Sequence, residues 1–338
     1  MPSAYKDKYT PMFAPNPPGL VSAAIASLSA KRLSNYRKFF ATKDDSELYG
    51  LYCWNESISM HLFKLIGITE IALRNQFHKA LSQHYGAVGS ADSKDWYNFL
   101  ALNPTSARSL QKITHYKRKG NWIPNVPQPT PDDVVANLTF GFWPHLLDVK
   151  IDIHQQAVDW GLILPNIVSG HRQKTVQYWK KQAEQDQLFA RIDLVNELRN
   201  RVAHHEPIWK AGPLLEETRD RPTKPQRATV AAAPSTETEV ITRLALLYDR
   251  TLELLHWCSP ALANVHKQSE THAQFHSTNS VAGIAAYRDT IRNRGDFDIA
   301  NHTKLSTLKR DLKRLKRNGQ SVRMLSAGTP IGWLTIHN

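Results

Sequence analysis

The chain is poor in cysteine and has no long apolar run. Its two cysteines in 338 residues, Cys53 and Cys258, exclude a disulfide scaffold and a cysteine-rich metal site, and each is expected to be a small core residue. No apolar run approaches the roughly 18 residues of a membrane-spanning helix. Residues 1–18 also lack the apolar stretch of a signal peptide. We therefore expect a cytoplasmic protein with no membrane partner.

Acidic side chains are scarce relative to basic ones. The chain has 43 Lys and Arg against 30 Asp and Glu, a formal net charge of +13, and 41% hydrophobic residues. Such a composition supports a soluble globular core, and the excess of cations favours a polyanion or an acidic protein as partner. The excess is greatest after Asn301, where one acid, Asp311, stands against Lys304, Lys309, Arg310, Lys313, Arg314, Lys316, Arg317 and Arg323.

Strand signals are few, and apolar residues recur mainly at helical spacing, which predicts a mainly α protein. The expected helices are Leu20–Phe40, Asp44–His84, Ser106–Lys117, Asp132–Asp148, Asp186–His204, Thr238–Cys258, Tyr287–Asn293 and Thr303–Asn318. Four prolines exclude a helix from Asn121–Pro131. Gly319 is a candidate helix C-cap, and Ser321–Ile336 can form a short hairpin around Gly328.

These elements suggest four regions along the chain. We expect an extended arm over residues 1–19 and a helical domain over 20–265, interrupted by a flexible insertion at about 214–237. A polar linker over 266–282 is expected to lead to a basic appendage over 283–338. The insertion and the linker are assigned from their prolines, charges and small polar residues.

The most informative motif lies at the expected end of the 186–204 helix. Its sequence from Glu197 to Pro207 is ELRNRVAHHEP. The apolar residues before and within it recur at helical spacing, and Pro207 disfavours helix at the residue before it, so the helix should end near His204 or His205. Asn200 and His204 then share a face at i, i+4. Arg199 is long enough to reach around to that face.

These residue types suit the cleavage of RNA. The Arg199 guanidinium can hold phosphate oxygens with two parallel hydrogen bonds and stabilise the charge of a phosphorane. Histidine is the side-chain type that best suits proton transfer near neutral pH, so His204 can move a proton. Asn200 can orient His204 or the phosphate. The interpretation that competes with catalysis by Arg199 and His204 is a salt bridge at a surface or an interface.

The segment from Arg199 to His204 also fits the Arg-x4–6-His motif of the HEPN superfamily. Two further blocks accompany it, Tyr52-x-Trp54-Asn55 with Glu70-Ile71-Ala72-Leu73-Arg74-Asn75, and Leu138-Thr139-Phe140-Gly141-Phe142-Trp143. Together the three blocks resemble the Abi-like (AbiD/AbiF-type) family of bacterial abortive-infection proteins. The resemblance covers about Ser22 to Ala263 and not the basic tail.

The resemblance implies a HEPN-like helical bundle with a small basic appendage. It implies a metal-independent endoribonuclease of anti-phage defence or of a toxin–antitoxin pair, with no cofactor and with RNA as substrate. The products are then a 2′,3′-cyclic phosphate and a 5′-hydroxyl. Because one histidine cannot easily be both acid and base, and HEPN proteins pair two motifs across a dimer, a homodimer with a composite site is expected. An antitoxin or a phage-derived trigger is a further expected partner.

Other residues near the motifs have structural interpretations. His205 is expected to cap the helix or bond to backbone, and Glu197 is expected to pair with Arg201 at i, i+4. A zinc site from His204, His205 and Glu206 is disfavoured, because adjacent side chains diverge on a helix.

The two companion blocks allow similar choices. Glu70 and Arg74 are expected to form an ion pair next to Asn75, although Arg74 with His78 is also the place to look for a second half-site within one chain. Phe140, Phe142 and Trp143 are expected in the core rather than in a base-stacking platform.

The basic tail carries one apolar stripe, formed by Leu305, Leu308, Leu312 and Leu315. The helix can therefore dock on its own domain, or contact nucleic acid, anionic lipid or an acidic partner. We favour contact with the RNA backbone, through Lys309, Arg310, Lys313, Arg314, Lys316 and Arg317. Two functional alternatives remain, a non-catalytic HEPN scaffold that binds RNA or a partner, and a DNA-binding regulator that uses the 303–318 helix.

Overall fold

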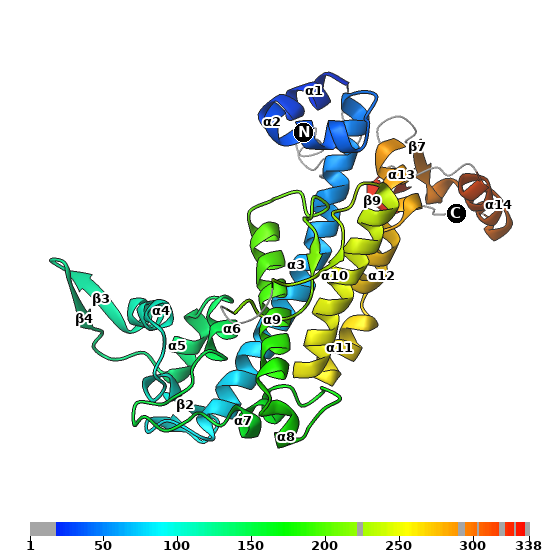
Figure 1. Cartoon of the computed structure of the whole chain (residues 1–338). Helices are drawn as coiled ribbons and strands as arrows, with labels where there is room; N and C mark the ends of the chain where they lie inside the picture. Colours follow the sequence, from blue (N-terminus) through cyan, green and yellow to red (C-terminus); the bar gives the residue numbers. More distant parts are fainter. Residues whose placement is uncertain are drawn as a thin grey trace, which may run out of the picture. The chain divides into compact units, whose positions relative to one another are not determined.

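The computed structural model describes residues 18–221, 226–289, 295–302, 304–317, 322–327 and 329–334. The protein is mainly helical, as expected (Figure 1). Two compact units divide it. Unit 1 holds the described residues within 1–61, 234–245 and 273–338, and unit 2 holds those within 62–233 and 246–272. The expected arm before residue 18, Gly319 and Gly328 lie outside the described residues.

The longer helices lie close to their expected positions. They are α3 (Asp45–Ser82), α4 (Pro104–Thr114), α9 (Gln182–Ala203), α10 (Glu237–Cys258) and α14 (Leu305–Arg317). The helix expected over Tyr287–Asn293 is instead α13 (Val281–Asp289), which begins six residues earlier. The segment expected as one helix over 132–148 is divided into α5 (Pro131–Asn137) and α6 (Phe142–Leu146). Three further helices are α7 (Trp160–Ile167), α8 (Val176–Trp179) and α11 (Pro260–Lys267). No described helix has the length and apolar composition needed to cross a membrane.

The expected helix over Leu20–Phe40 is instead two helices. These are α1 (Pro18–Ser27) and α2 (Ala30–Phe39), and Ser29 between them has φ of 73°. A positive φ lies outside the helical region, so the helix cannot continue through Ser29. The apolar spacing is kept on both sides of the break, which explains why periodicity alone predicts a single helix.

Two short hairpins of unit 2 were not expected from the sequence. β1 (Gly89–Ser90) pairs with β2 (Ser93–Lys94) just before a 3₁₀ turn, η1 (Trp96–Asn98). β3 (His115–Arg118) pairs with β4 (Asn121–Pro124) in an antiparallel hairpin. β3 replaces the end of the helix expected to reach Lys117, because α4 ends at Thr114.

The segment expected as a linker, residues 266–282, contains a helix, α12 (Glu270–Thr278).

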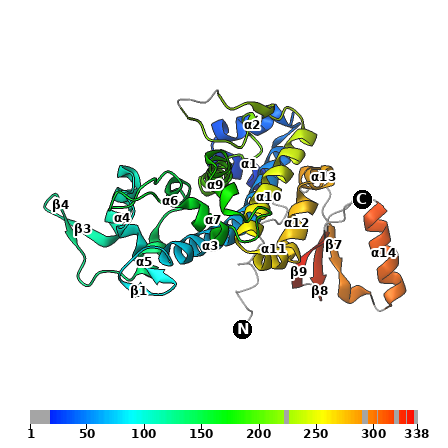
Figure 2. The same ribbon diagram turned by 60° about the horizontal axis from the view of Figure 1, so that its bottom comes forward.

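The core of unit 2 is built from apolar residues at helical spacing. In α3 these are Leu62, Leu65, Ile66, Leu73, Phe77 and Leu81, all at most 1% exposed. In both views α9 lies beside α3 and the carboxyl-terminal part of α10 (Figure 1, Figure 2). Phe140, Phe142 and Trp143 are buried, and the Trp143 ring centroid lies 5.7 Å from that of Phe77. The three aromatic side chains of the 138–143 block are therefore core, as expected.

Ion pairs anchor the 214–237 insertion to α9, and two short strands, β5 (Leu214–Leu215) and β6 (Thr229–Ala231), pair within it. Arg191 on α9 donates to both carboxylate oxygens of Glu217, at 2.8 and 2.7 Å. Buried Asp186 accepts from Arg221 at 2.5 Å. The first part of the insertion, for which the sequence predicts flexibility, is thus held by charges on α9.

The carboxyl-terminal residues of unit 1 form a small sheet with one helix. β7 (Gly295–Asp298) pairs in parallel with β8 (Val322–Ser326), which pairs antiparallel with β9 (Thr329–Leu334). The β8–β9 hairpin was expected, whereas β7 was not. A second 3₁₀ turn, η2 (Ile299–Asn301), and α14 connect β7 to β8, and α14 lies beside the sheet (Figure 2). Its residues Leu308, Leu312 and Leu315 pack with Phe297 and Val322.

Cys258 is buried and Cys53 partly buried, and both are free thiols. Burial raises the pKa of the Cys258 thiol to about 12. At neutral pH this thiol is protonated and packs as a small apolar group.

A buried histidine makes unit 2 sensitive to acid. His266 is 2% exposed, and its Nε2 lies 2.7 Å from the Tyr248 hydroxyl. Burial, then the charges of His272 and Lys64, lower its pKa from 6.5 to about 4. Below pH 6.5 the unfolded chain therefore takes up a proton that the folded one refuses, and stability falls. We expect a loss of about 2 kcal/mol from this group between pH 7.5 and 5.

Urea unfolding followed by tryptophan fluorescence at the two pH values measures this loss. His266→Gln keeps a polar side chain and removes the titration, so its unfolding free energy should fall less over the same range. An equal fall in both proteins would contradict the assignment to His266.

Candidate functional site at the end of helix α9

The end of α9 has one buried and one exposed face. Leu198 and Val202 are buried in unit 2, which follows from their i, i+4 spacing. Asn200 and His204 are exposed and Arg199 is partly exposed. The helix therefore places the three predicted catalytic residues toward solvent and holds them from behind through its apolar face.

The backbone after α9 closes in a Schellman motif. The His205 N–H donates to the Val202 carbonyl at 3.0 Å, and the Glu206 N–H donates to the Arg201 carbonyl at 2.9 Å. His205 has φ of 53°, the left-handed conformation that this motif requires at its turn residue. The expectation that His205 terminates the helix is thus met by its backbone.

Arg201 fixes the segment that follows the helix. Its Nη2 donates to the carbonyls of Pro207 and Lys210, both at 2.7 Å. Its ion pair is with Glu206, at 3.5 Å, and not with Glu197 as expected. Burial lowers the pKa of the Arg201 guanidinium despite the nearby Glu206 and Glu197 carboxylates. The turn at His205 brings Glu206 back toward Arg201, which the helical spacing of Glu197 could not indicate.

Arg199 differs from Arg201 in having only one weak hydrogen bond of its own. Its Nη1 lies 3.5 Å from the Asn200 Oδ1. Arg199 and His204 are five residues apart, so their side chains leave the helix about 140° from one another. His204 lies one turn beyond Asn200, on its side of the helix. The structure thus places the Arg199 side chain against Asn200, and Asn200 lies next to the turn that carries His204. The Arg199 guanidinium remains able to bind an anion.

The 70–75 and 138–143 blocks make contacts within unit 2. Arg74 on α3 donates to the Ala136 carbonyl at 3.3 Å, in place of the expected ion pair with Glu70. Asn75 is exposed and Glu70 partly exposed. A Cβ at Gly141 would lie 3.6 Å from the Asn196 amide of α9, one turn before Asn200. The 138–143 block therefore contacts α9 close to its exposed motif.

His78 has a structural role. The Trp96 indole N–H donates to its Nδ1 at 2.8 Å, and its Nε2 lies 3.0 Å from Ser93 Oγ and 3.3 Å from Asp132. Because an indole only donates, Nδ1 is unprotonated and Nε2 carries the hydrogen. The ring is 7% exposed, and burial lowers its pKa. Both ring nitrogens are thus engaged inside unit 2, which favours the structural interpretation of Arg74 and His78 over a second half-site.

The basic face of α14 is open in unit 1. Lys309, Arg310, Lys313, Arg314 and Arg317 are exposed and line a hollow of about 720 Å³ together with Ser306 and Asp311. Asp311 is engaged by His302 at 3.1 Å and by Arg310 at 3.4 Å. The side chain of Lys316 lies outside the described residues. Leu308, Leu312 and Leu315 of the apolar stripe pack on the sheet, whereas Leu305 is 66% exposed. The helix thus docks on its own domain, one of the expected alternatives, and these basic side chains stay exposed.

No group of three or more His, Cys, Asp or Glu side chains in the described part of the chain is arranged to hold a metal ion.

Residues 23–210 match the family described as Abi-like protein. The chain belongs to the Abi-like protein family. The matched region contains all three motif blocks and ends three residues after Pro207. Neither the curated proteins nor the solved structures give a match.

Membership of the Abi-like family suggests a role in abortive-infection defence. Within this Abi-like chain, sequence reasoning missed Arg201 as the residue that fixes the turn after α9. Its acceptors lie six and nine residues further on, and Pro207 is the only sequence signal of a turn there.

Proposed function

We propose that this Abi-like protein is a metal-independent endoribonuclease of anti-phage defence or of a toxin–antitoxin pair. The observation that carries the proposal is the solvent-accessible end of α9, where Arg199, Asn200 and His204 project from a helix end fixed by the 205–210 turn. Arg199 has a guanidinium with little internal bonding. An anion can therefore bind it without breaking a structural ion pair.

The proposed reaction uses the 2′-hydroxyl of RNA as nucleophile. Neutral His204 takes the 2′-hydroxyl proton while the 2′-oxygen attacks the adjacent phosphorus. Arg199 stabilises the charge on the phosphorane oxygens, and Asn200 orients the phosphate or the imidazole. The P–O5′ bond then breaks and the 5′-oxygen takes up a proton. The products are a 2′,3′-cyclic phosphate and a 5′-hydroxyl end.

The proton for the 5′-oxygen requires a second acid. We propose that it comes from a second copy of the chain, in a homodimer whose two Arg199–His204 motifs meet. The open basic face of α14 would bind the RNA backbone through phosphate contacts, which position a strand without specifying its sequence. An antitoxin or a phage-derived trigger would control the assembled site.

The test is incubation of the purified full-length protein with single-stranded RNA in EDTA, followed by analysis of the ends. A 2′,3′-cyclic phosphate and a 5′-hydroxyl are expected, and an RNA with 2′-deoxynucleotides throughout should stay intact. Cleavage that needs an added divalent metal, or that leaves a 5′-phosphate, would refute the mechanism.

A non-catalytic scaffold is the second candidate, favoured by the cationic hollow on α14. It predicts salt-sensitive RNA binding without cyclic phosphate product.

A further inference from the structure

Residues 96–131 of unit 2 contain no Asp or Glu in 36 positions. The same segment holds five cations, Arg108, Lys112, Lys117, Arg118 and Lys119. It includes η1, α4 and the β3–β4 hairpin. A run of this length with charge of one sign favours a polyanion at this surface.

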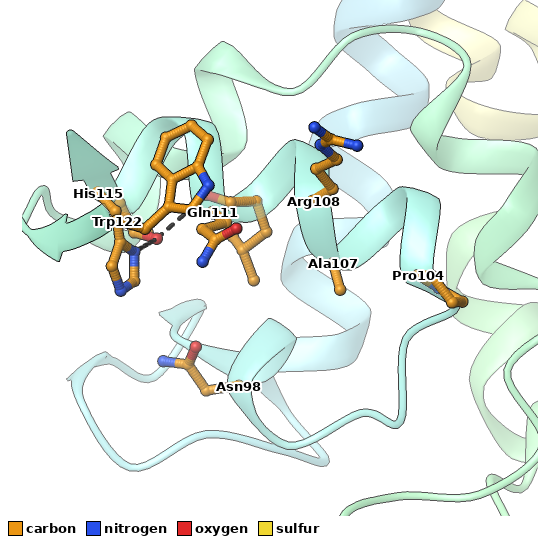
Figure 3. Close-up of a pocket in the computed structure, with 9 residues that line it drawn as sticks. Asn98, Pro104, Ala107, Arg108, Gln111, His115 and Trp122 are labelled. Atoms are coloured by element: carbon orange, nitrogen blue, oxygen red, sulfur yellow. Dashed lines mark hydrogen bonds between the residues drawn. The ribbon is translucent and has the colours of Figure 1, made fainter. Parts of the chain in front are cut away.

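A groove lies in this segment between α4, η1 and the hairpin (Figure 3). We call it the hairpin groove. Its volume is about 530 Å³, and its lining residues are Asn98, Pro104, Ala107, Arg108, Leu110, Gln111, Thr114, His115 and Trp122. This volume is within the range of small-molecule sites. The lining has no carboxylate.

The hairpin places its residues on two different faces. Lys117 pairs directly with Trp122, and His115 with Pro124, so these four side chains share the face that includes the groove residues His115 and Trp122. Tyr116 and Arg118 lie on the opposite face. Lys119 and Gly120 turn the chain with φ of 49° and 87°, so the turn is of the two-residue kind with positive φ at both positions.

The groove offers an aromatic ring together with amide groups. Trp122 and Gln111 lie close together at one end, and Asn98 faces them from the other side (Figure 3). Trp122 is only partly buried. The Asn98 amide nitrogen donates to Asp95 at 3.2 Å, which leaves its oxygen to accept. The Asp95 carboxylate also accepts from the Ala87 and Val88 N–H groups, at 2.8 and 2.9 Å.

The other polar groups of the groove are partly engaged. His115 Nδ1 lies 2.8 Å from the Thr114 hydroxyl, which also donates to the Leu110 carbonyl. The guanidinium of Arg108 is exposed at the rim. Lys112 and Lys117 are exposed nearby on α4 and β3. The groove thus combines the aromatic face of Trp122, side-chain amides that can donate or accept hydrogen bonds, and cations at its edge.

We propose that the hairpin groove binds single-stranded RNA, with one base stacked on Trp122 and the neighbouring phosphates on Arg108, Lys112 and Lys117. Stacking platforms beside cationic tracks are how proteins hold single strands. An acidic protein would use the cations and leave the aromatic groove unfilled. The choice of RNA over DNA rests on the proposed function, for which this groove would hold the substrate strand away from the cut.

The test uses the full-length His204→Ala protein, so that binding is measured without cleavage. A fluorescently labelled 12-nucleotide single-stranded RNA is titrated and its anisotropy is followed. Trp122→Ala is expected to weaken binding by about 5- to 150-fold, the equivalent of one stacked base, and Trp122→Phe should weaken it less. Tyr116→Ala is the matched control, since Tyr116 is 46% exposed on the other hairpin face, and it should bind as before.

Equal affinities for all three variants, or equal losses in Trp122→Ala and Tyr116→Ala, would overturn the proposal. A DNA strand of the same sequence should bind more weakly, and equal, Trp122-dependent binding of DNA would overturn the assignment to RNA. Lys117→Ala should reduce the dependence of log affinity on log salt by about 0.7, and an unchanged dependence would remove the phosphate contact. Because binding is measured apart from cleavage, an inactive wild type would refute the proposed enzyme and leave this result standing.

Discussion

His204→Ala is expected to lower the rate of RNA cleavage by about 10²- to 10⁴-fold, the usual contribution of a positioned general acid–base. His204 is exposed at the end of α9, so its removal leaves no cavity in the core. Arg199→Ala is expected to cost about 10²- to 10³-fold, since it removes a donor to the charge that develops on phosphate. Arg199→Lys keeps the charge but not the two parallel hydrogen bonds, so its cleavage rate should lie between those of the wild type and Arg199→Ala.

His205→Gly is the matched control for His204→Ala. It removes an exposed imidazole one residue away, and glycine accepts the positive φ of 53° at this position. Cleavage by His205→Gly should stay near the wild-type rate. A loss in His205→Gly equal to that in His204→Ala, or full activity in both motif variants, would contradict the assignment of His204. Single-turnover rates with folding checked by circular dichroism give the comparison.

A mixed dimer extends the same test to the second copy. If one histidine takes the proton and the partner's donates one, then dimers of wild-type and His204→Ala chains should be impaired although one intact motif remains. Full activity per intact motif in mixed dimers would contradict a composite site. The two chains are mixed at several ratios, which sets the fraction of mixed dimers, and the cleavage rate is measured at each ratio.

Periodicity was enough to predict the long helices of this protein, because they bury one face throughout. The i, i+3 and i+4 apolar positions of α3 and α9 are the buried ones, and proline placed the end of α9 within two residues. The break at Ser29 and the strand at His115 could not be predicted in this way. The break and the strand each depend on the backbone conformation of a few residues. The apolar spacing on the two sides of Ser29 does not change at the break.

Site residues could be predicted where local spacing determines their position. Asn200 and His204 share a side of α9 because they are four residues apart. Contacts between distant residues could not be predicted, such as the indole of Trp96 on His78. The absence of acid from residues 96–131 was visible in the sequence, but only the fold places Trp122 and Arg108 around one groove.

The ion pairs of the 214–237 insertion are also contacts between distant residues that the sequence could not predict. Removing one of them should have a large effect on stability. Arg191→Met is expected to lower the free energy of unfolding by about 3–5 kcal/mol, as when one partner of a buried ion pair is removed. The Arg191 side chain is 9% exposed; it donates to Glu217 and also to Glu253 at 2.5 Å, and lies 4.7 Å from the Trp257 ring centroid. Without it, Glu217 still has the Arg250 guanidinium at 3.3 Å.

Urea unfolding of Arg191→Met measures this loss, with Lys79→Met as the control for an exposed pair. Lys79 and Asp92 are 3.4 Å apart with side chains 56% and 60% exposed, and such pairs contribute about 0–1 kcal/mol. Glu217→Gln added to Arg191→Met should restore part of the stability, because the unpaired carboxylate is then gone. Equal losses in Arg191→Met and Lys79→Met would mean that Arg191 does not hold the insertion. The anchoring of residues 214–221 to α9 would then have to come from the Asp186–Arg221 pair and from Arg219, which lies 4.0 Å from the Phe189 ring centroid.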